Sequence, residues 1–420
     1  MRGRASHRLA GGGGCQINNG WATGLGPALD EEIRPAEMFP RLTIAFGAIL
    51  AALVAIYLAN LAPPYDRWGG IVGRDFVNMW NGARMALAGH ADRLSDPSHY
   101  LAELRRVFAD ATWRAWSYPP DLLLFVWPLG LMPYMAAWAV WSVGGLALYL
   151  FTAAGRDRSA KTLGALAAAP AVGVNLFFGQ NGFFSAALII GAVRELDRRP
   201  IVSGICLGLL TMKPQLGMLF PIALVVSGRW QCLVAAAATA VVLVLATGAV
   251  FGFGIWADYV AKILPYQTQV MTRAYGPGLA MMPSAFGIGR LWMVPTSVAF
   301  LFQAPFAIFA VVAVAWTFWK RRDPLLSAAV LVTAGFVATP YVFVYDMVVL
   351  GWLIAILHRR FGPDLLFPVL IWLLPLITMA CGFVESLAIP APPLAPLVLA
   401  AFLARLVAML RSDAAAPAAA

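Results

Sequence analysis

The chain has 420 residues, of which 61% are hydrophobic and only 12% are charged, and its formal net charge is +10. Soluble domains carry about 25% charged residues, so this composition excludes a soluble globular protein. The basic residues form short clusters between apolar runs, which is typical of cytoplasmic loops and argues against nucleic-acid binding. Runs of about 18 apolar residues recur, and each can span a bilayer. We therefore predict an all-α, polytopic membrane protein.

The N-terminal 37 residues are polar and rich in glycine, and they lack the compact apolar core of a signal peptide. We expect residues 1–37 to be a disordered tail, with a start of translation at Met38 as the alternative. An integral-membrane domain is expected over residues 38–411, and a short C-terminal tail over residues 412–420.

The first predicted span, at residues 43–62, is followed by a polar segment at residues 63–121, which we call the polar island. Two arginines precede the span, which predicts a cytoplasmic N-terminus and an island on the outer side. Two amphipathic helices are expected in the island, one over residues 75–88 and one that begins at Asp96-Pro97. Both are expected to lie on the membrane surface. Their predicted apolar faces are Phe76, Trp80, Ala83 and Leu87, and Leu101, Leu104, Val107 and Phe108.

The apolar run after the island is broken at Pro128 and Pro133, so we expect an irregular approach followed by one crossing. Assigning every basic cluster to the cytoplasm predicts about twelve spans with both termini inside. The expected spans are 43–62, 130–154, 163–178, 182–196, 200–213, 215–228, 231–251, 292–319, 325–340, 345–357, 364–384 and 394–411.

Four polar features gather on the predicted outer side, and each also has a plain structural interpretation. Asp75, after Arg74, can simply cap the first island helix. The segment from Trp116 to Tyr118 and the Gly-Gln-Asn-Gly sequence at residues 179–182 can be ordinary turns. Lys213 is harder to dismiss, because a charge at membrane depth is costly and usually faces a cavity or a partner.

Together these residues suit a reaction on a lipid-borne phosphate. A carboxylate can take the proton from an acceptor hydroxyl and can favour positive charge on a sugar ring, and Asp75 is the best placed of the seven island acids. Asp66, Asp92, Asp96, Glu103, Asp110 and Asp121 are expected to be solvated or capping. Cations for the phosphate are Lys213, Arg74, Arg273 or Arg290. Sugar contacts are expected from Gln180, Asn181, and Trp116 or Tyr118.

The order of these motifs resembles glycosyltransferase family 87, within the GT-C glycosyltransferases, over about residues 40–360. The motifs are Asp75-Phe76, Tyr118-Pro119-Pro120, Gly179-Gln180-Asn181, Lys213-Pro214 and Thr339-Pro340-Tyr341. The resemblance implies transfer of mannose or another hexose from a polyprenyl-phosphate donor to a lipid or cell-envelope glycan, at the outer face of the cell membrane.

Within that resemblance, Asp75 corresponds to the general base and Lys213 to a phosphate contact. The late outer loop departs from the family pattern of Ser-Pro-x-Ser-Trp, and here Tyr345 and Asp346 stand in that place as candidate substrate contacts. The four cysteines lack metal-ligand spacing and no Asp-x-Asp pair occurs, so we expect no metal and no cofactor.

A secondary transporter or lipid flippase is the main alternative, because twelve spans and an intramembrane Lys213 also suit that class. The two halves show no internal repeat, however, and the polar groups collect on one side instead of at the midplane. A non-catalytic scaffold leaves this one-sided clustering unexplained.

Overall fold

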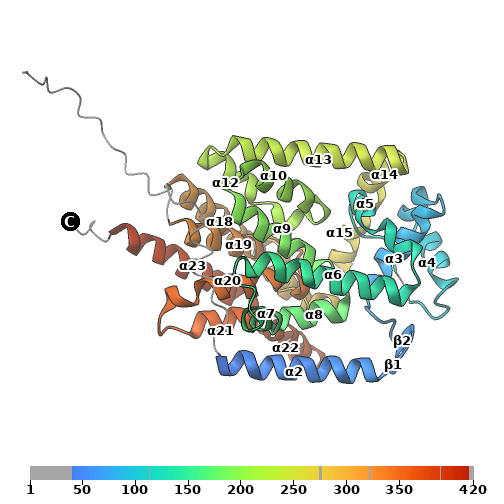
Figure 1. Ribbon diagram of the computed structural model, residues 1–420, viewed down its shortest axis with the longest axis horizontal. Helices are drawn as coiled ribbons and strands as arrows, with labels where there is room; N and C mark the ends of the chain where they lie inside the picture. Colours follow the sequence, from blue (N-terminus) through green and yellow to red (C-terminus); the bar gives the residue numbers. More distant parts are fainter. Residues whose placement is uncertain (1–39, 113, 274–276, 321–322, 388, 416–420) are drawn as a thin grey trace, which may run out of the picture.

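The computed structural model describes residues 40–112, 114–273, 277–320, 323–387 and 389–415, and this part of the chain is mostly helical, as predicted. The predicted tail at residues 1–37 lies outside these residues. Three long helices, α2 (Pro40–Ala59), α6 (Tyr134–Ala154) and α13 (Trp230–Phe251), run along the long axis of the molecule (Figure 1). The polar island, with its short hairpin of β1 (Leu61–Ala62) and β2 (Tyr65–Asp66), lies at one end of that axis.

Five helices in the described residues are long and apolar enough to cross a membrane. They are α2, α6, α13, α18 (Thr296–Trp319) and α23 (Leu394–Ala415). Two bent pairs raise the number to seven if each pair is one span: α7 (Ala160–Ala167) with α8 (Pro170–Phe178), and α21 (Leu366–Trp372) with α22 (Leu374–Ser386), each bent by 66°. The predicted count of twelve is not confirmed and stays a prediction.

The predicted spans that are not among these seven correspond to helices that are apolar but too short to cross a membrane unaided. A helix of 15 residues, such as α19 (Pro324–Ala338), is about 22 Å long at 1.5 Å per residue, whereas the hydrocarbon core is about 30 Å thick. The other short helices at predicted spans are α9 (Gly182–Glu195), α10 (Pro200–Leu209), α11 (Pro214–Gly217), α12 (Phe220–Ser227) and α20 (Val348–Leu357). Outside the predicted spans lie α5 (Leu123–Val126), α14 (Gly254–Asp258), α15 (Leu264–Arg273), α16 (Pro277–Ala280) and α17 (Ala285–Leu291).

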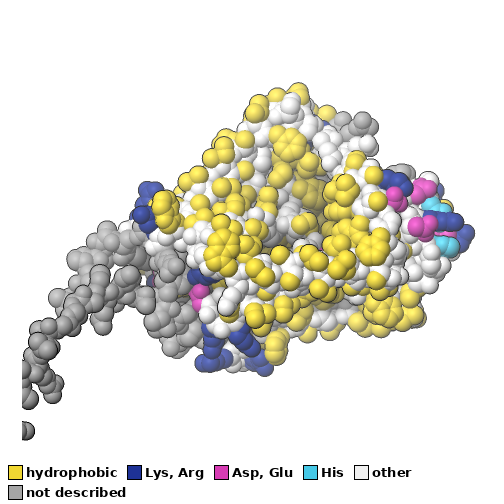
Figure 2. All heavy atoms as spheres, turned by 90° about the horizontal axis from the view of Figure 1, so that it is seen from above, with side chains coloured by type: hydrophobic (Ala, Val, Ile, Leu, Met, Phe, Trp, Pro, Cys, Tyr) yellow, Lys and Arg dark blue, Asp and Glu magenta, His cyan; other side chains and the backbone are white. Residues whose placement is uncertain are grey.

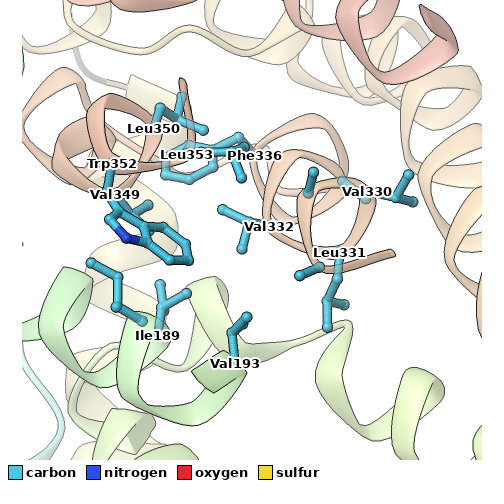
Figure 3. Packing of buried hydrophobic residues seen from close by; sticks show 14 of the residues in the cluster. Ile189, Val193, Val330, Leu331, Val332, Phe336, Val349, Leu350, Trp352 and Leu353 are labelled. Atoms are coloured by element: carbon cyan, nitrogen blue, oxygen red, sulfur yellow. The ribbon is translucent and has the colours of Figure 1, made fainter. Parts of the chain in front are cut away.

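The main core is built around helices that are apolar on all sides. All ten residues of α20 are buried, and so is every residue of α19 after Pro324. A helix without a polar face needs partners all round it, and here protein supplies them. Figure 3 shows side chains of α9, α19 and α20 pointing toward one another, with the Trp352 ring close to Ile189.

The long outer helices expose apolar side chains instead. Ile44 on α2 is 72% exposed, Val234 on α13 is 65% exposed, and Leu301 on α18 is 69% exposed. Figure 2 shows hydrophobic side chains spread over the body of the molecule and charged ones gathered toward its ends. So much apolar surface is stable in lipid and a liability in water, so the chain is a membrane protein.

The polar island folds around its own core. The two expected helices are present as α3 (Phe76–Leu87) and α4 (Pro97–Arg105), and Asp96 caps α4 by accepting hydrogen bonds from the amides of Ser98 and His99 at 2.9 and 3.2 Å. Of the predicted faces, Leu87 and Val107 are exposed. The remaining members are buried: Phe76, Trp80, Ala83, Leu101, Leu104 and Phe108.

Helix α3 differs from the expected surface helix, because eight of its twelve residues are buried. The irregular approach segment, predicted from Pro128 and Pro133, packs on it as α5 and the 3-10 helix Trp127–Leu131. The contact is close: a Cβ added to Gly130 would lie 2.9 Å from the Ala83 carbonyl carbon. Protein therefore covers most of α3, on sides that a helix lying in a membrane surface would leave exposed.

Candidate active site

A strained turn delivers Asp75 to the start of α3. Gly73 and Arg74 have φ of +72° and +36°, and the second is unusual for a residue with a side chain. Arg74 is held in place because its Nη2 donates to Asp66 Oδ2 at 2.5 Å. The amide of Asp75 then donates to the Phe178 carbonyl at 3.0 Å, which ties the start of α3 to the end of α8.

The Asp75 side chain faces the 179–182 turn. It makes no capping hydrogen bond to α3, so the plain capping interpretation does not describe it. Instead, Asp75 Oδ2 accepts a hydrogen bond from Gln180 Nε2 at 3.0 Å. Within the described part of the chain, no group donates a hydrogen bond to Asp75 Oδ1. One carboxylate oxygen is thus fixed and the other can receive a proton.

Burial raises the pKa of Asp75 above its usual value. The hydrogen bond from Gln180 and the charges of Arg114, Lys213 and Arg74 lower this pKa, but they do not offset the burial. A raised pKa makes the ionised carboxylate a stronger base. Arg114 was missed in the sequence, where the only hint is its position just before Trp116 and Tyr118.

The 179–182 turn fits between two other loops only because it begins and ends with glycine. Gly179 has φ of +61°, and a Cβ there would lie 2.9 Å from the Gly73 carbonyl oxygen. A Cβ on Gly182 would lie 2.1 Å from the carbonyl oxygen of Tyr345. The turn is therefore a close-packed bridge from the Asp75 loop to the late loop.

On the other side of this turn lies a buried ion pair. Lys213 Nζ donates to Asn181 Oδ1 at 2.8 Å and pairs with the carboxylate of Asp346. The residues Lys213, Asn181 and Asp346 are 7%, 0% and 1% exposed. Asp346 Oδ2 also accepts from the Phe343 amide at 3.1 Å, and the Tyr345 ring lies 4.9 Å from Lys213 Nζ. Lys213 therefore has the partner charge that an ammonium group buried in the protein needs.

Most of the predicted site residues are thus connected. Asp75 is hydrogen-bonded to Gln180, and Lys213 contacts both Asn181 and Asp346. Tyr118 belongs to the same group, because its hydroxyl and Gln180 Nε2 are 3.3 Å apart. Gln180 and Asn181 are adjacent in the 179–182 turn, and their side chains contact Asp75 on one side of it and Lys213 on the other.

Arg74, Trp116 and Arg290, which were also predicted to contact the substrate, contact other parts of the protein instead. Arg74 pairs with Asp66, and its guanidinium lies over the Phe177 ring. Trp116 is 2% exposed and packs against Gly82, so its ring is covered by protein and not presented for a sugar. Arg290 donates to the carbonyls of Val294 and Thr272 at 2.6 and 2.7 Å, and the Arg273 side chain lies outside the described residues.

Two of the six remaining island acids are not solvated, contrary to expectation. Asp66 is 3% exposed and accepts hydrogen bonds from the amides of Trp68 and Gly70, both at 3.0 Å, so it organises the turn before Arg74. Asp121 is 2% exposed and accepts from Thr211 Oγ1 at 2.9 Å. Both act within the protein interior.

The close packing of the 179–182 turn predicts the effect of a substitution on stability. Gly182→Ala is expected to destabilise the protein by about 3 kcal/mol, at the upper end of overpacking effects, because its Cβ would overlap backbone that cannot move aside easily. The matched control is Gly144→Ala in α6, where nothing lies within 4 Å of the added Cβ and alanine favours the helix by about 0.5–1 kcal/mol. Thermal midpoints in detergent compare the two. Equal midpoints would show that the turn is not tightly packed.

Comparison with known families identifies the family of the chain. The sequence model of glycosyltransferase family 87 matches residues 116–344, which is more than half of the chain. The matched range includes Tyr118, Gln180, Asn181 and Lys213, whereas Asp75 precedes it and Asp346 follows it. Comparison with curated proteins and with solved structures gave no match. The chain belongs to glycosyltransferase family 87.

Proposed function

We propose that this membrane glycosyltransferase moves mannose or another hexose from a polyprenyl-phosphate donor to a lipid or cell-envelope glycan acceptor. The observation that carries the proposal is the Asp75 carboxylate, which Gln180 holds through one oxygen, while the other accepts no hydrogen bond from the described residues. A lipid-borne donor suits a protein whose long helices expose apolar side chains. The outer face of the cell membrane is the proposed side of the reaction, from the distribution of the basic clusters.

In the proposed reaction, Asp75 Oδ1 takes the proton of the acceptor hydroxyl as the hydroxyl oxygen bonds to the anomeric carbon of the sugar. The bond from that carbon to the donor phosphate oxygen breaks, and its electron pair leaves with the polyprenyl phosphate. Positive charge develops on the sugar ring in the transition state, and the nearby carboxylate favours it. The proton ends on Asp75 and then passes to solvent.

The neighbouring residues are assigned supporting roles. Gln180 orients the Asp75 carboxylate, and Tyr118 is the aromatic group proposed to contact the sugar. Asn181, Lys213, Tyr345 and Asp346 lie on the other side of the 179–182 turn and are assigned further contacts with the substrate. Arg114 joins Lys213 as a candidate cation for the donor phosphate, because its charge acts on Asp75 and its buried Nε has no hydrogen-bond partner among the described residues.

A donor comparison tests this function. Purified protein in nanodiscs would be incubated with a lipid acceptor extract and either labelled polyprenyl-phosphate mannose or the matching nucleotide sugar. Labelled product is expected only from the lipid-linked donor. Product from the nucleotide sugar alone would contradict the proposal.

The Gln180 hydrogen bond predicts a shift in pH dependence. The base acts only when ionised, so activity falls as the pH decreases through the raised pKa of Asp75. Gln180→Leu removes a hydrogen bond that lowers this pKa, so the acidic limb of the rate profile is expected to move to higher pH. The control is Gln269→Leu on an exposed part of α15. An unmoved limb with a reduced rate would mean that Gln180 does not act through Asp75.

A further inference from the structure

A buried acid that the proposed reaction does not use lies at the end of the polar island. Asp121 is 2% exposed and lies three residues after Tyr118, in the 3-10 helix Pro120–Leu122. Its carboxyl group contacts the hydroxyl of Thr211, two residues before Lys213. This single contact therefore joins two segments of the chain that each carry a residue of the candidate site.

The hydrogen atoms available at this contact indicate the charge of Asp121. Thr211 Oγ1 lies 2.9 Å from Asp121 Oδ2 and 2.6 Å from the carbonyl oxygen of Gly208. Both neighbours are acceptors when Asp121 is ionised, but a threonine hydroxyl has only one hydrogen to donate. A neutral Asp121 can donate to the Thr211 hydroxyl, which then donates to Gly208. Only the neutral acid makes both contacts hydrogen bonds at the same time.

The surroundings of Asp121 favour the neutral acid as well. The helices that pack against the segment Pro120–Leu122 are α5, α13 and the 3-10 helix Leu210–Met212, and none of them has a charged residue. Asp121 forms no ion pair with the residues that the structure describes. Burial raises the pKa of Asp121, and hydrogen bonds from Thr211 and from neighbouring backbone amides lower it without offsetting the burial.

The titratable neighbours keep their charge as Asp121 ionises. Burial and the charge of Asp121 raise the pKa of Tyr259 to about 12, so this tyrosine is neutral at lower pH. Asp258 lines a small cavity with the residue before Asp121, and the hydrogen bond from Lys262 lowers its pKa. The hydrogen bond that neutral Asp121 donates is complete below the pKa of aspartate in the unfolded chain. It is lost as the pH rises through the raised pKa in the folded protein.

We propose that Asp121 is a neutral carboxylic acid that positions the segments of Tyr118 and Lys213, and that its ionisation disturbs the reaction site. Tyr118 lies on the Asp75 side of the 179–182 turn, and Lys213 lies on the other side. The contact made by Asp121 therefore fixes the spacing of groups on both sides of the turn. Asp121 is a positioning residue, since it acts through these groups. The inference rests on the proposed function for its rate measurements alone.

Infrared spectroscopy tests the neutral form without any substrate. Full-length protein with isotope-labelled aspartate carboxyl groups would be compared with the Asp121→Asn variant at neutral pH. The native spectrum is expected to contain the C=O band of a protonated carboxyl group that the variant lacks. Asp110→Asn, at an exposed acid of the island, is expected to keep that band. Identical protonated-carboxyl bands in the native protein and in Asp121→Asn would show that Asp121 is ionised, and the proposal fails.

Rates with the lipid-linked donor test the positioning role. Thr211→Val keeps the side-chain volume but removes the hydroxyl, so kcat is expected to fall by about tenfold or more, because small displacements of positioned groups are costly. Asp121→Leu is expected to have the same effect. Asp121→Asn is expected to keep the native rate, because its amide still donates to Thr211. The control is Thr152→Val, whose exposed hydroxyl donates to the Leu148 carbonyl within α6 at 2.8 Å and whose loss is expected to leave kcat unchanged.

The pH profile separates positioning from a purely structural role. The active form has Asp75 ionised and Asp121 neutral, so the two acids control opposite limbs of the profile. The native rate is expected to fall over the pH interval in which the infrared band disappears, and the Asp121→Asn rate is not. If the band persists to the highest pH measured, the native rate should show no such fall.

Two results would overturn the positioning role: loss of the band without loss of rate, or a Thr211→Val variant with native turnover. A native protein without glycosyl transfer from the lipid-linked donor would contradict the proposed function instead. The infrared result does not depend on that activity, so the two failures can be told apart.

Discussion

Asp75→Asn is expected to lower glycosyl transfer by about 10²–10⁴-fold, the usual contribution of a general base, without lowering the thermal midpoint. The amide oxygen of asparagine can still accept the hydrogen bond from Gln180, so the local structure is kept while the proton acceptor is lost. The measurement is initial rate with the lipid-linked donor, paired with a thermal melt in the same detergent.

The sign of the stability effect follows from the pKa of Asp75. Burial makes this pKa higher in the folded protein than in the unfolded chain. The charged carboxylate therefore costs stability once the pH exceeds the unfolded value of about 3.9. At neutral pH the uncharged asparagine removes that cost, so the midpoint should stay level or rise.

The matched control is Asp110→Asn, at an exposed acid of the same island. It is expected to keep both the rate and the midpoint of the native protein. An Asp75→Asn variant with full turnover would rule out Asp75 as the base, whatever its stability.

The second large effect is expected at the buried ion pair. Lys213→Met should destabilise the protein by about 3–5 kcal/mol, because it leaves the Asp346 carboxylate buried without its cation. Replacing both residues, with Lys213→Met and Asp346→Leu together, should recover a large part of that loss, since no unpaired charge then remains. Thermal midpoints of the two single variants and the double variant form the cycle that measures the coupling.

A lysine in an exposed pair provides the control. Lys262 Nζ lies 2.8 Å from Asp258 Oδ1, four residues away, with its side chain 56% exposed. Such a pair contributes about 0.3–0.5 kcal/mol, so Lys262→Met is expected to have little effect. If Lys213→Met is equally mild, the Lys213–Asp346 contact does not hold the late loop against the 179–182 turn.

The parts of the structure that follow from local rules were predictable. Asp96 followed by Pro97 marks the start of α4, and the prolines at 128 and 133 mark the irregular approach to α6. Lys213 drew attention because a charge in an apolar stretch needs a partner, and its partners Asn181 and Asp346 were both among the predicted residues. The order of the motifs indicated the family, and the family match over residues 116–344 confirms that resemblance.

What could not be predicted depends on packing in three dimensions. An apolar helix has the same composition whether lipid or protein surrounds it, so the complete burial of α20 is invisible in the sequence. The pairing of Arg74 with Asp66 depends on a left-handed backbone at Arg74, which sequence patterns assign to glycine or asparagine. Trp116 is covered because Gly82 on α3 leaves room for its ring. These contacts decide which polar residues reach Asp75 and which do not.

The most direct test of the central claim is a structure with a non-hydrolysable polyprenyl-phosphonate sugar and an acceptor bound together. The expected result places the reacting acceptor hydroxyl within about 2.6–3.2 Å of Asp75 Oδ1, with Gln180 still bonded to Oδ2. A structure in which the acceptor hydroxyl and the anomeric carbon lie far from Asp75, with another carboxylate beside the hydroxyl, would show that Asp75 is not the general base.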